Sequence, residues 1–570
     1  MLRITNGEVY DPANGINGEV RDICIDEGRI ADSVDYGRAL GSGRTIDATG
    51  MIVMPGGVDM HAHIAGPKVN TARKMRPEDH RLDPVPRTAS TRSGVGKTVP
   101  STFATGYRYA AMGYTTAFDA AVPPIAARHA HEEFSDIPVI DKGFFVLMGN
   151  NEYIMQQIAA GDRERMCNYV AWLLRATRGY AVKMVNPGGV EMWKTLSNSH
   201  GLDEEVTGFG VTPRRIIQSL AEASMDLHLP HPVHIHCNNL GVAGNWQTTL
   251  ETMKSLDGRR GHMAHVQFHS YGGNPGELFV SRVAELAEYV NTHSNITVDI
   301  GQILFGDTTS MTGDGPLGHL LHQVTGRKWV NVDVENEAGC GIVPIEYKDK
   351  SHMHTTQWAV GLEWYLMVRD PWRIALSTDH PNGASFVSYP QVIRLLMDRE
   401  YRREALKKVN QKAIAKTSLP DLDREYSLFE IAIITRAAPA RILGLKHKGH
   451  LGIGADADVT IYDKCEDREK MFSVPRYVIK EGEILVEDGS VRRETFGKTM
   501  YVSPGYDTAV EKDIRKYFKK YYTIEFENYP VQLEHYLPRP QEIKTEQETG
   551  NGKQETGNGK RETGNGKRHS

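Results

Sequence analysis

Short apolar runs recur through the middle of the chain, and each is followed by a stretch with helical character. Eight such runs alternate with helical segments, as a (β/α)8 TIM barrel of the α/β class requires. The expected strands are Val58–His61, Thr115–Ala121, Phe144–Met148, Ala181–Val185, Val233–Cys237, Met263–Phe268, Ile296–Ile300 and Ile374–Thr378. A further strand-like run at Lys328–Glu335 leaves this count open by one.

The two ends of the chain have a different texture, in which short β-type runs alternate with turn residues. The N-terminal runs are Leu2–Thr5, Arg21–Ile25, Thr45–Asp47 and Met51–Met54, with turns expected at Asn6-Gly7 and Asp26–Gly28. The C-terminal runs are Asp458–Tyr462, Tyr477–Ile479 and Gly482–Val486. We therefore expect both ends to build one small β-sandwich.

The chain thus divides into four expected parts: a composite β-sandwich at 1–55 and 445–500, a barrel at 56–444, an extension at 501–545 and a tail at 546–570. Residues 548–568 repeat ETGNGK three times, each followed by Gln or Arg. This repeat has no apolar residue to bury, so it predicts a disordered tail, with a tether or docking segment as the alternative.

Composition excludes several classes of partner. The 570 residues carry a formal net charge of −5, which provides no basic field for nucleic acid or an anionic membrane surface. The five cysteines are scattered, so the spacing predicts no cluster or zinc ribbon. Since no stretch of 18 or more apolar residues occurs and the N-terminus lacks an apolar signal region, we expect a soluble cytoplasmic protein.

Histidines stand at the ends of three expected strands. His61 and His63 follow the first strand, and alternation places both side chains on one face. The same spacing recurs at His234 and His236; we favour His236 as the functional member because it lies nearer the strand end. His265 occupies the sixth strand. Neutral imidazole is a preferred zinc ligand, so these positions predict metal binding.

A lysine and a carboxylate complete this set, whereas His269, with the parity of His265, is expected to have an orienting or structural role. Lys183 interrupts an apolar strand, where an unpaired ammonium is costly. Its neutral amine could take up CO₂ and bridge two metal ions as a carbamate; pairing with a barrel carboxylate is the alternative. Asp379 ends the eighth strand as a metal ligand and proton shuttle, or as a turn residue before Pro-Asn-Gly. Together these residues predict a two-metal hydrolytic site.

In these residues and their order, the chain resembles the amidohydrolase superfamily. More narrowly, it is similar to the amidohydrolase-type subunits of formylmethanofuran dehydrogenase and of the bacterial formyltransferase/hydrolase complex, over roughly residues 1–540. The strings that carry this resemblance are HIAGPKVN at 63–70, ARKMRPED at 72–79, PSTFATGYRYAAMGYTTA at 100–117, ARHAHEEF at 127–134, WLLRAT at 172–177, HVQFHSYGG at 265–273 and DHPNG at 379–383.

The resemblance implies a reversible reaction between formylmethanofuran plus water and methanofuran plus formate. It also implies two zinc ions bridged by carboxylated Lys183, with partner subunits that carry redox or formyl-transfer chemistry. The ligands carried over are His61, His63, Lys183, His236, His265 and Asp379, of which Asp379 also moves the proton.

Three further residues are candidates for substrate binding. Arg73 and Lys74 could hold the anionic tail of methanofuran, although a solvated basic loop fits equally well. Asn238 follows the fifth strand and could hydrogen-bond an amide substrate or simply form a turn.

Two other functions stay open. One is an independent amidohydrolase acting on a cyclic amide or an N-acyl amino acid, which would be active without partners. The other is a scaffold protein of the complex that has lost catalysis, against which the complete ligand set argues.

Overall fold

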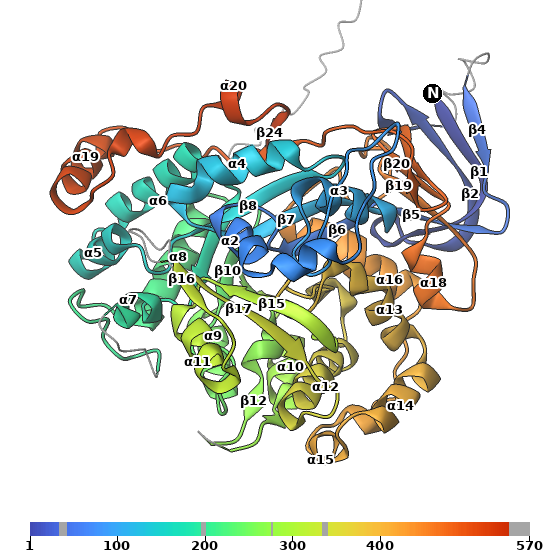
Figure 1. Cartoon of the computed structure of the whole chain (residues 1–570). Helices are drawn as coiled ribbons and strands as arrows, with labels where there is room; N and C mark the ends of the chain where they lie inside the picture. The colour runs from blue at the N-terminus through green and yellow to red at the C-terminus, as the bar shows by residue number, and fades with distance from the viewer. Residues whose placement is uncertain (33–42, 195–200, 275–276, 333–339, 546–570) are drawn as a thin grey trace, which may run out of the picture.

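The computed structural model of the chain describes residues 1–32, 43–194, 201–274, 277–332 and 340–545. The predicted tail at 546–570 lies outside these ranges. Eight parallel strands form a nearly closed barrel. They are β6 (Gly57–Ala62), β7 (Tyr114–Val122), β8 (Asp141–Leu147), β9 (Ala181–Val185), β10 (Val233–His236), β11 (Gly261–Met263), β14 (Ile296–Asp299) and β18 (Ile374–Ala375). The predicted barrel is therefore confirmed (Figure 1).

The barrel closes at its carboxyl end, where Ala62 and His380 form a parallel bridge. Helices connect and follow the strands. They include α3 (Thr102–Ala111), α4 (Ala127–Asp136), α5 (Glu152–Ala160), α6 (Arg163–Thr177), α8 (Pro213–Asp226), α9 (Trp246–Ser255), α10 (Val283–Thr292), α12 (His352–Met367), α13 (Tyr389–Met397), α14 (Arg399–Lys408), α16 (Leu428–Ala432) and α17 (Ala438–Leu443).

The sixth strand differs from its prediction. It ends at Met263, and Val266–His269 forms the short 3-10 helix η4 instead of strand. The reason lies in the backbone of His265, whose φ of 34° belongs to the left-handed region and cannot continue a strand.

The two chain ends share a nine-stranded sheet in which N-terminal β5 pairs with β19 from the end of the chain. Figure 1 shows these blue and orange strands side by side. One apolar core joins both ends, which confirms a composite β-domain. The strands are β1 (Leu2–Asp11), β2 (Ile16–Asp26), β3 (Arg29–Ala31), β4 (Arg44–Asp47), β5 (Met51–Pro55), β19 (Val459–Asp463), β20 (Tyr477–Lys480), β21 (Glu483–Glu487) and β22 (Ser490–Val491).

One predicted turn in this domain was wrong. Asn6-Gly7 does not break the first strand: β1 runs through it with a shift of register between Ile4 and Gly7. Asn6 has a φ of 59°, so the residue pair produces a bulge instead of a turn. The boundaries expected between domains stay predictions.

A buried ionic cluster ties the β-domain to the barrel. Lys448 Nζ lies 2.8 Å from Asp456 and 2.7 Å from Asp458, and it also contacts Asp141 at the start of β8. Lys480 on β20 lies 2.7 Å from the same Asp141 carboxylate. All five side chains are buried, so strands from both ends meet the barrel through charges that must remain paired.

A separate three-stranded sheet lies next to the carboxyl end of the barrel. It consists of β15 (Gly306–Thr312), β16 (Val330–Val332) and β17 (Cys340–Tyr347), with α11 (Gly315–Thr325) against it. The extra run predicted at Lys328–Glu335 contributes β16 here and not a ninth barrel strand; its residues 333–335 lie outside the described ranges. The neighbouring α2 (Pro67–Met75) contacts β17.

The C-terminal extension returns to the barrel. β23 (Thr499–Tyr501) pairs with β8 and with β24 (Pro540–Glu542), while α19 (Val510–Tyr521) contacts α6. Within the described ranges, none of the helices combines the length and apolarity needed to cross a bilayer.

Candidate metal centre

A cavity of about 390 Å³ lies at the carboxyl ends of the barrel strands. All six side chains expected to bind metal line it, although they come from five different strand ends. They are His61, His63, Lys183, His236, His265 and Asp379. The structure therefore brings the predicted ligand set together.

His61, His63 and Asp379 converge at one corner of the cavity. Asp379 Oδ1 lies 3.1 Å from His61 Nε2 and 3.2 Å from His63 Nε2. The other carboxylate oxygen, Oδ2, accepts a 2.9 Å hydrogen bond from Asn382 Nδ2. Asn382 is fixed in turn by the Met311 amide, which donates to its Oδ1 at 2.6 Å. Asp379 is thereby oriented with Oδ1 toward the two imidazoles.

Lys183 projects from β9 into the same space. Its side chain is 1% exposed, and its Nζ has no hydrogen-bond partner among the described residues. Burial lowers the pKa of Lys183 to about 7, although the Asp299 and Asp379 charges raise it. A substantial share of this amine is therefore neutral near pH 7 and able to act as a nucleophile. Among the described residues, Lys183 Nζ forms no direct ion pair with a barrel carboxylate, which was the alternative.

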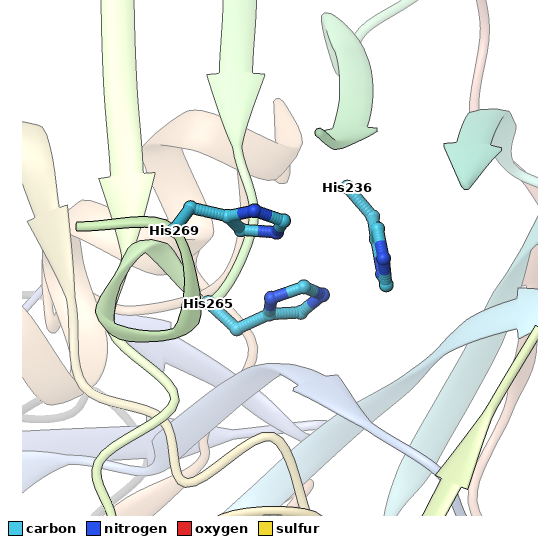
Figure 2. A group of neighbouring side chains, drawn as sticks. All are labelled: His236, His265 and His269. Carbon is cyan, nitrogen blue, oxygen red and sulfur yellow. The ribbon is translucent and has the colours of Figure 1, made fainter. Parts of the chain in front are cut away.

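His236 and His265 form a second corner, where their ring centroids are 4.6 Å apart. His269 lies beside them, 5.2 Å from each ring, as Figure 2 shows. Nitrogens of these three residues lie within 4.8 Å of one another. Burial lowers the pKa of both His265 and His269 well below 6.5, so these imidazoles are neutral.

Several buried atoms at the two corners make no well-formed hydrogen bond in the described part of the chain, although His61 Nε2 and Asp379 Oδ1 lie 3.1 Å apart; this is the pattern expected of metal donors. They are His61 Nε2, Lys183 Nζ, His265 Nδ1 and Asp379 Oδ1. Imidazole nitrogens and a carboxylate oxygen are the donors that zinc prefers. The residues present therefore fit a metal centre.

Asp299, at the end of β14, connects the ligands of different strands, and the sequence did not single it out. Its Oδ2 lies 2.9 Å from His61 Nδ1 and 3.0 Å from His262 Nε2. Its Oδ1 accepts hydrogen bonds from the His265 amide at 3.0 Å and from Ser377 Oγ at 2.8 Å. Burial raises the pKa of Asp299, but the neighbouring His61 and His262 and these hydrogen bonds hold it well below 3.8. The carboxylate is anionic and fully hydrogen-bonded.

A row of buried histidines leads away from His61. His231 Nδ1 lies 3.0 Å from the Ile442 carbonyl oxygen, which can only accept, so Nδ1 carries the proton. His231 Nε2 must then accept from His234 Nδ1 at 3.0 Å. His234 Nε2 and Asp299 Oδ2 both accept from His61 Nδ1, at 3.0 and 2.9 Å. Because burial keeps His231 and His234 neutral, this row places the Nδ1 proton of His61 away from the cavity.

The preference for His236 over His234 agrees with this arrangement, since His236 lines the cavity and His234 lies beneath His61. His236 Nε2 is 3.3 Å from Asp314, which precedes α11 and was also missed. On the other side, Lys68 Nζ lies 2.9 Å from His63 Nδ1. The sequence offered one signal for Asp299, Asp314 and Lys68. Each is a charged residue at the end of an apolar strand or close to a loop that carries a predicted ligand.

The three expected substrate contacts do not line the cavity. Asn238 directs its Nδ2 to Asn186 and to the Pro187 carbonyl, at 2.9 and 3.0 Å. Arg73 pairs with Glu133 at 3.2 Å, and Lys74 is exposed on α2. We therefore assign no substrate contact to these three residues.

The lining includes two other cations, Arg327 and Lys348, whose side chains are 55% and 61% exposed. Apolar side chains of α11 stand next to them: Leu317, Leu320, Leu321 and Val324. Glu346 also lines the cavity, 3.9 Å from Arg327 and 3.5 Å from Lys348, so the entrance combines an apolar wall with two cations and one carboxylate.

Comparisons with known proteins agree with this geometry. The model of the amidohydrolase family matches residues 44–486. The protein FwdA of Methanocaldococcus jannaschii is 47% identical over 93% of this chain and 97% of its own. One subunit of the formyltransferase/hydrolase complex Fhc of Methylorubrum extorquens is 37% identical over 91% of this chain and 94% of its own.

The solved structure of the Methylorubrum extorquens formyltransferase/hydrolase complex, in complex with methylofuran, contains a chain of the same shape. It superposes with a TM-score of 0.88 at 35% identity, over 96% of this chain and 100% of that one.

Proposed function

This chain belongs to the amidohydrolase family, and we propose that it is the hydrolytic subunit of a formylmethanofuran dehydrogenase or formyltransferase/hydrolase complex. Its reaction would interconvert formylmethanofuran plus water with methanofuran plus formate. The observation that carries this proposal is the convergence of six donor side chains on one cavity, with buried atoms left unpaired. The similarity to FwdA and to the Fhc protein over more than nine-tenths of the chain supports formylmethanofuran as the substrate.

The proposed metal centre would hold two zinc ions. His61, His63 and Asp379 would hold one ion, His236 and His265 the other, and carboxylated Lys183 would bridge them. Carboxylation joins the neutral Lys183 nitrogen to the carbon of CO₂, and the nitrogen loses one proton to solvent. When bound, the ions would polarise the formyl carbonyl and lower the pKa of water.

The side chains of the chain itself would then move the proton. As a bond forms between the water oxygen and the formyl carbon, Asp379 accepts the proton of that water. It passes the proton to the amide nitrogen as the C–N bond breaks, which yields formate and the free amine. Asn382 orients Asp379 for this transfer through its bond to Oδ2.

The entrance of the cavity could bind the part of methanofuran that lies away from the formyl group. We place its anionic tail at Arg327 and Lys348, which line the cavity, in place of Arg73 and Lys74, which do not. We also propose a cytoplasmic location, which the unpaired state of the described cysteines Cys24, Cys167, Cys237 and Cys465 supports.

The test is formate release from formylmethanofuran by the purified complex. Intact complex, complex carrying Lys183→Ala, and complex stripped of metal and then reloaded with zinc are compared. We expect mutation and stripping each to abolish release, and zinc to restore the stripped sample alone. Undiminished release by the variant would leave the chain as a scaffold. Release from cyclic amides by the isolated chain, with none from the formyl compound, would support an independent amidase.

A further inference from the structure

His269 is a buried side chain at this site that the proposed function leaves unused. It ends η4, one helical turn after His265, and is 0% exposed. Across the described ranges neither of its ring nitrogens has a hydrogen-bond partner. A buried polar group left unpaired is destabilising, so a ligand from outside the described residues would stabilise this imidazole.

The surroundings of His269 identify that partner chemically. Its ring lies nearly parallel to that of His265, at 22°, and steeply inclined to that of His236, at 73° (Figure 2). One nitrogen from each residue falls within a common 4.8 Å span. Each imidazole can direct one nitrogen lone pair into this space, and a divalent cation can accept all three.

We propose that His269 is a ligand of the metal ion that His236 and His265 hold, which makes it a three-imidazole position. The inference rests on the proposed function, because it presupposes the two-metal centre. His236 and His265 line the cavity whereas His269 does not, so His269 contributes from within the barrel wall. With the Lys183 carbamate, this position would have four protein donors, so water would bind there as a fifth ligand, which zinc can accommodate, or at the other ion.

Diffraction from the native complex tests this directly. An anomalous difference map at the zinc edge should show a peak about 2.0–2.1 Å from one His269 nitrogen, the usual zinc–imidazole distance. A peak that His236 and His265 share, but that lies beyond bonding distance from His269, would overturn the inference and leave the proposed function intact. No zinc at either corner would instead remove the proposed function.

Metal affinity provides an independent measurement that does not depend on activity. Zinc affinity is measured for the native complex and for complexes carrying His269→Gln or His131→Gln. His131 is a buried histidine that does not line the cavity. We expect His269→Gln to weaken one of the two ions more than about 100-fold, beyond the 10- to 100-fold typical of residues that only orient a ligand. His131→Gln should leave both affinities unchanged. A smaller loss in His269→Gln would assign this residue an orienting role and overturn the inference.

Discussion

Asp379 has different surroundings at its two carboxylate oxygens. Oδ2 is held by Asn382, while Oδ1 faces His61 and His63. The residue also has a φ of 49°, a left-handed conformation that is unfavourable for aspartate and that tertiary contacts must maintain. Strain of this kind is common where a side chain must point into a site.

Replacing this carboxylate tests its role as proton carrier. We expect Asp379→Asn to lower kcat for formate release by about 10²- to 10⁴-fold, the range for loss of a positioned acid or base. Circular dichroism should stay unchanged, because asparagine has the same shape. A kcat within tenfold of the native value would exclude Asp379 as the proton carrier.

Glu363 on α12 provides a pH-dependent contribution to stability that is separate from the site. Its carboxylate accepts from Ser281 Oγ and from the Ser418 amide, and burial raises its pKa to about 7 despite these bonds. The folded state therefore binds more protons than the unfolded state between about pH 4.5 and 7. Stability must fall as pH rises through that window, and stay reduced above it.

Glu363→Gln should remove this loss. We expect the variant to match the native chain near pH 4.5 and to be more stable at pH 8 by about 2–3 kcal/mol. The Ser281 hydroxyl can rotate to accept from the new amide, which preserves the hydrogen bonds. Urea unfolding at pH 4.5 and pH 8 measures the free energy of unfolding of both chains. The same difference between variant and native chain at both pH values would contradict the prediction.

At the scale of elements, His234 on β10 and His231 in the preceding loop orient His61, the proposed metal ligand on β6. The Ile442 carbonyl fixes the proton on His231, and this fixes the protons of His234 and His61 in sequence. His231 also stacks on Phe145 of β8, with ring centroids 4.9 Å apart at 14°. Packing and hydrogen bonding at this position can therefore be separated by mutation.

His231→Phe keeps the stacked ring but removes the acceptor for His234 Nδ1. We expect it to weaken zinc binding by about 10- to 100-fold, as loss of a residue that orients a metal-bound histidine does. His231→Gln, whose amide oxygen can still accept, should retain more of the affinity. Chelator competition measures both variants, and greater damage in His231→Gln would contradict the hydrogen-bond row.

The sequence could predict those features that depend on a local pattern of residues along the chain. Apolar runs specified the barrel strands, and alternation placed His61 and His63 on one face. Asp299 could not be recognised, because its role depends on three strands that meet only in the folded barrel. The early end of the sixth strand depends on the left-handed backbone of His265, which its sequence does not reveal.

For the whole molecule, the ionic cluster around Lys448 joins the β-domain to the barrel. Lys448→Ala would leave Asp141 and Asp458 with Lys480 as their remaining partner in the cluster, while Asp456 would keep Arg29 at 2.6 Å. We expect a loss of about 3–5 kcal/mol of stability, as when one partner of a buried ion pair is removed. Thermal unfolding measures the loss.

A surface pair provides the matched control. Lys464 is 54% exposed and lies 2.9 Å from Glu8, so Lys464→Ala should cost about 1 kcal/mol or less. Similar unfolding temperatures for both lysine variants would contradict a linking role for the buried cluster.

The pairing of β5 with β19 also has a consequence for how the protein is made. Residue 55 ends β5 and residue 459 begins β19, so 404 positions separate the two. At a synthesis rate of about 5–20 residues per second, the earlier strand waits roughly 20–80 s for its neighbour. During that interval the strand edge is unpaired and able to bind other nascent chains. The first-made part of this protein is therefore among the last to be completed, and we expect its open strand edge to favour association with other chains until β19 has been synthesised.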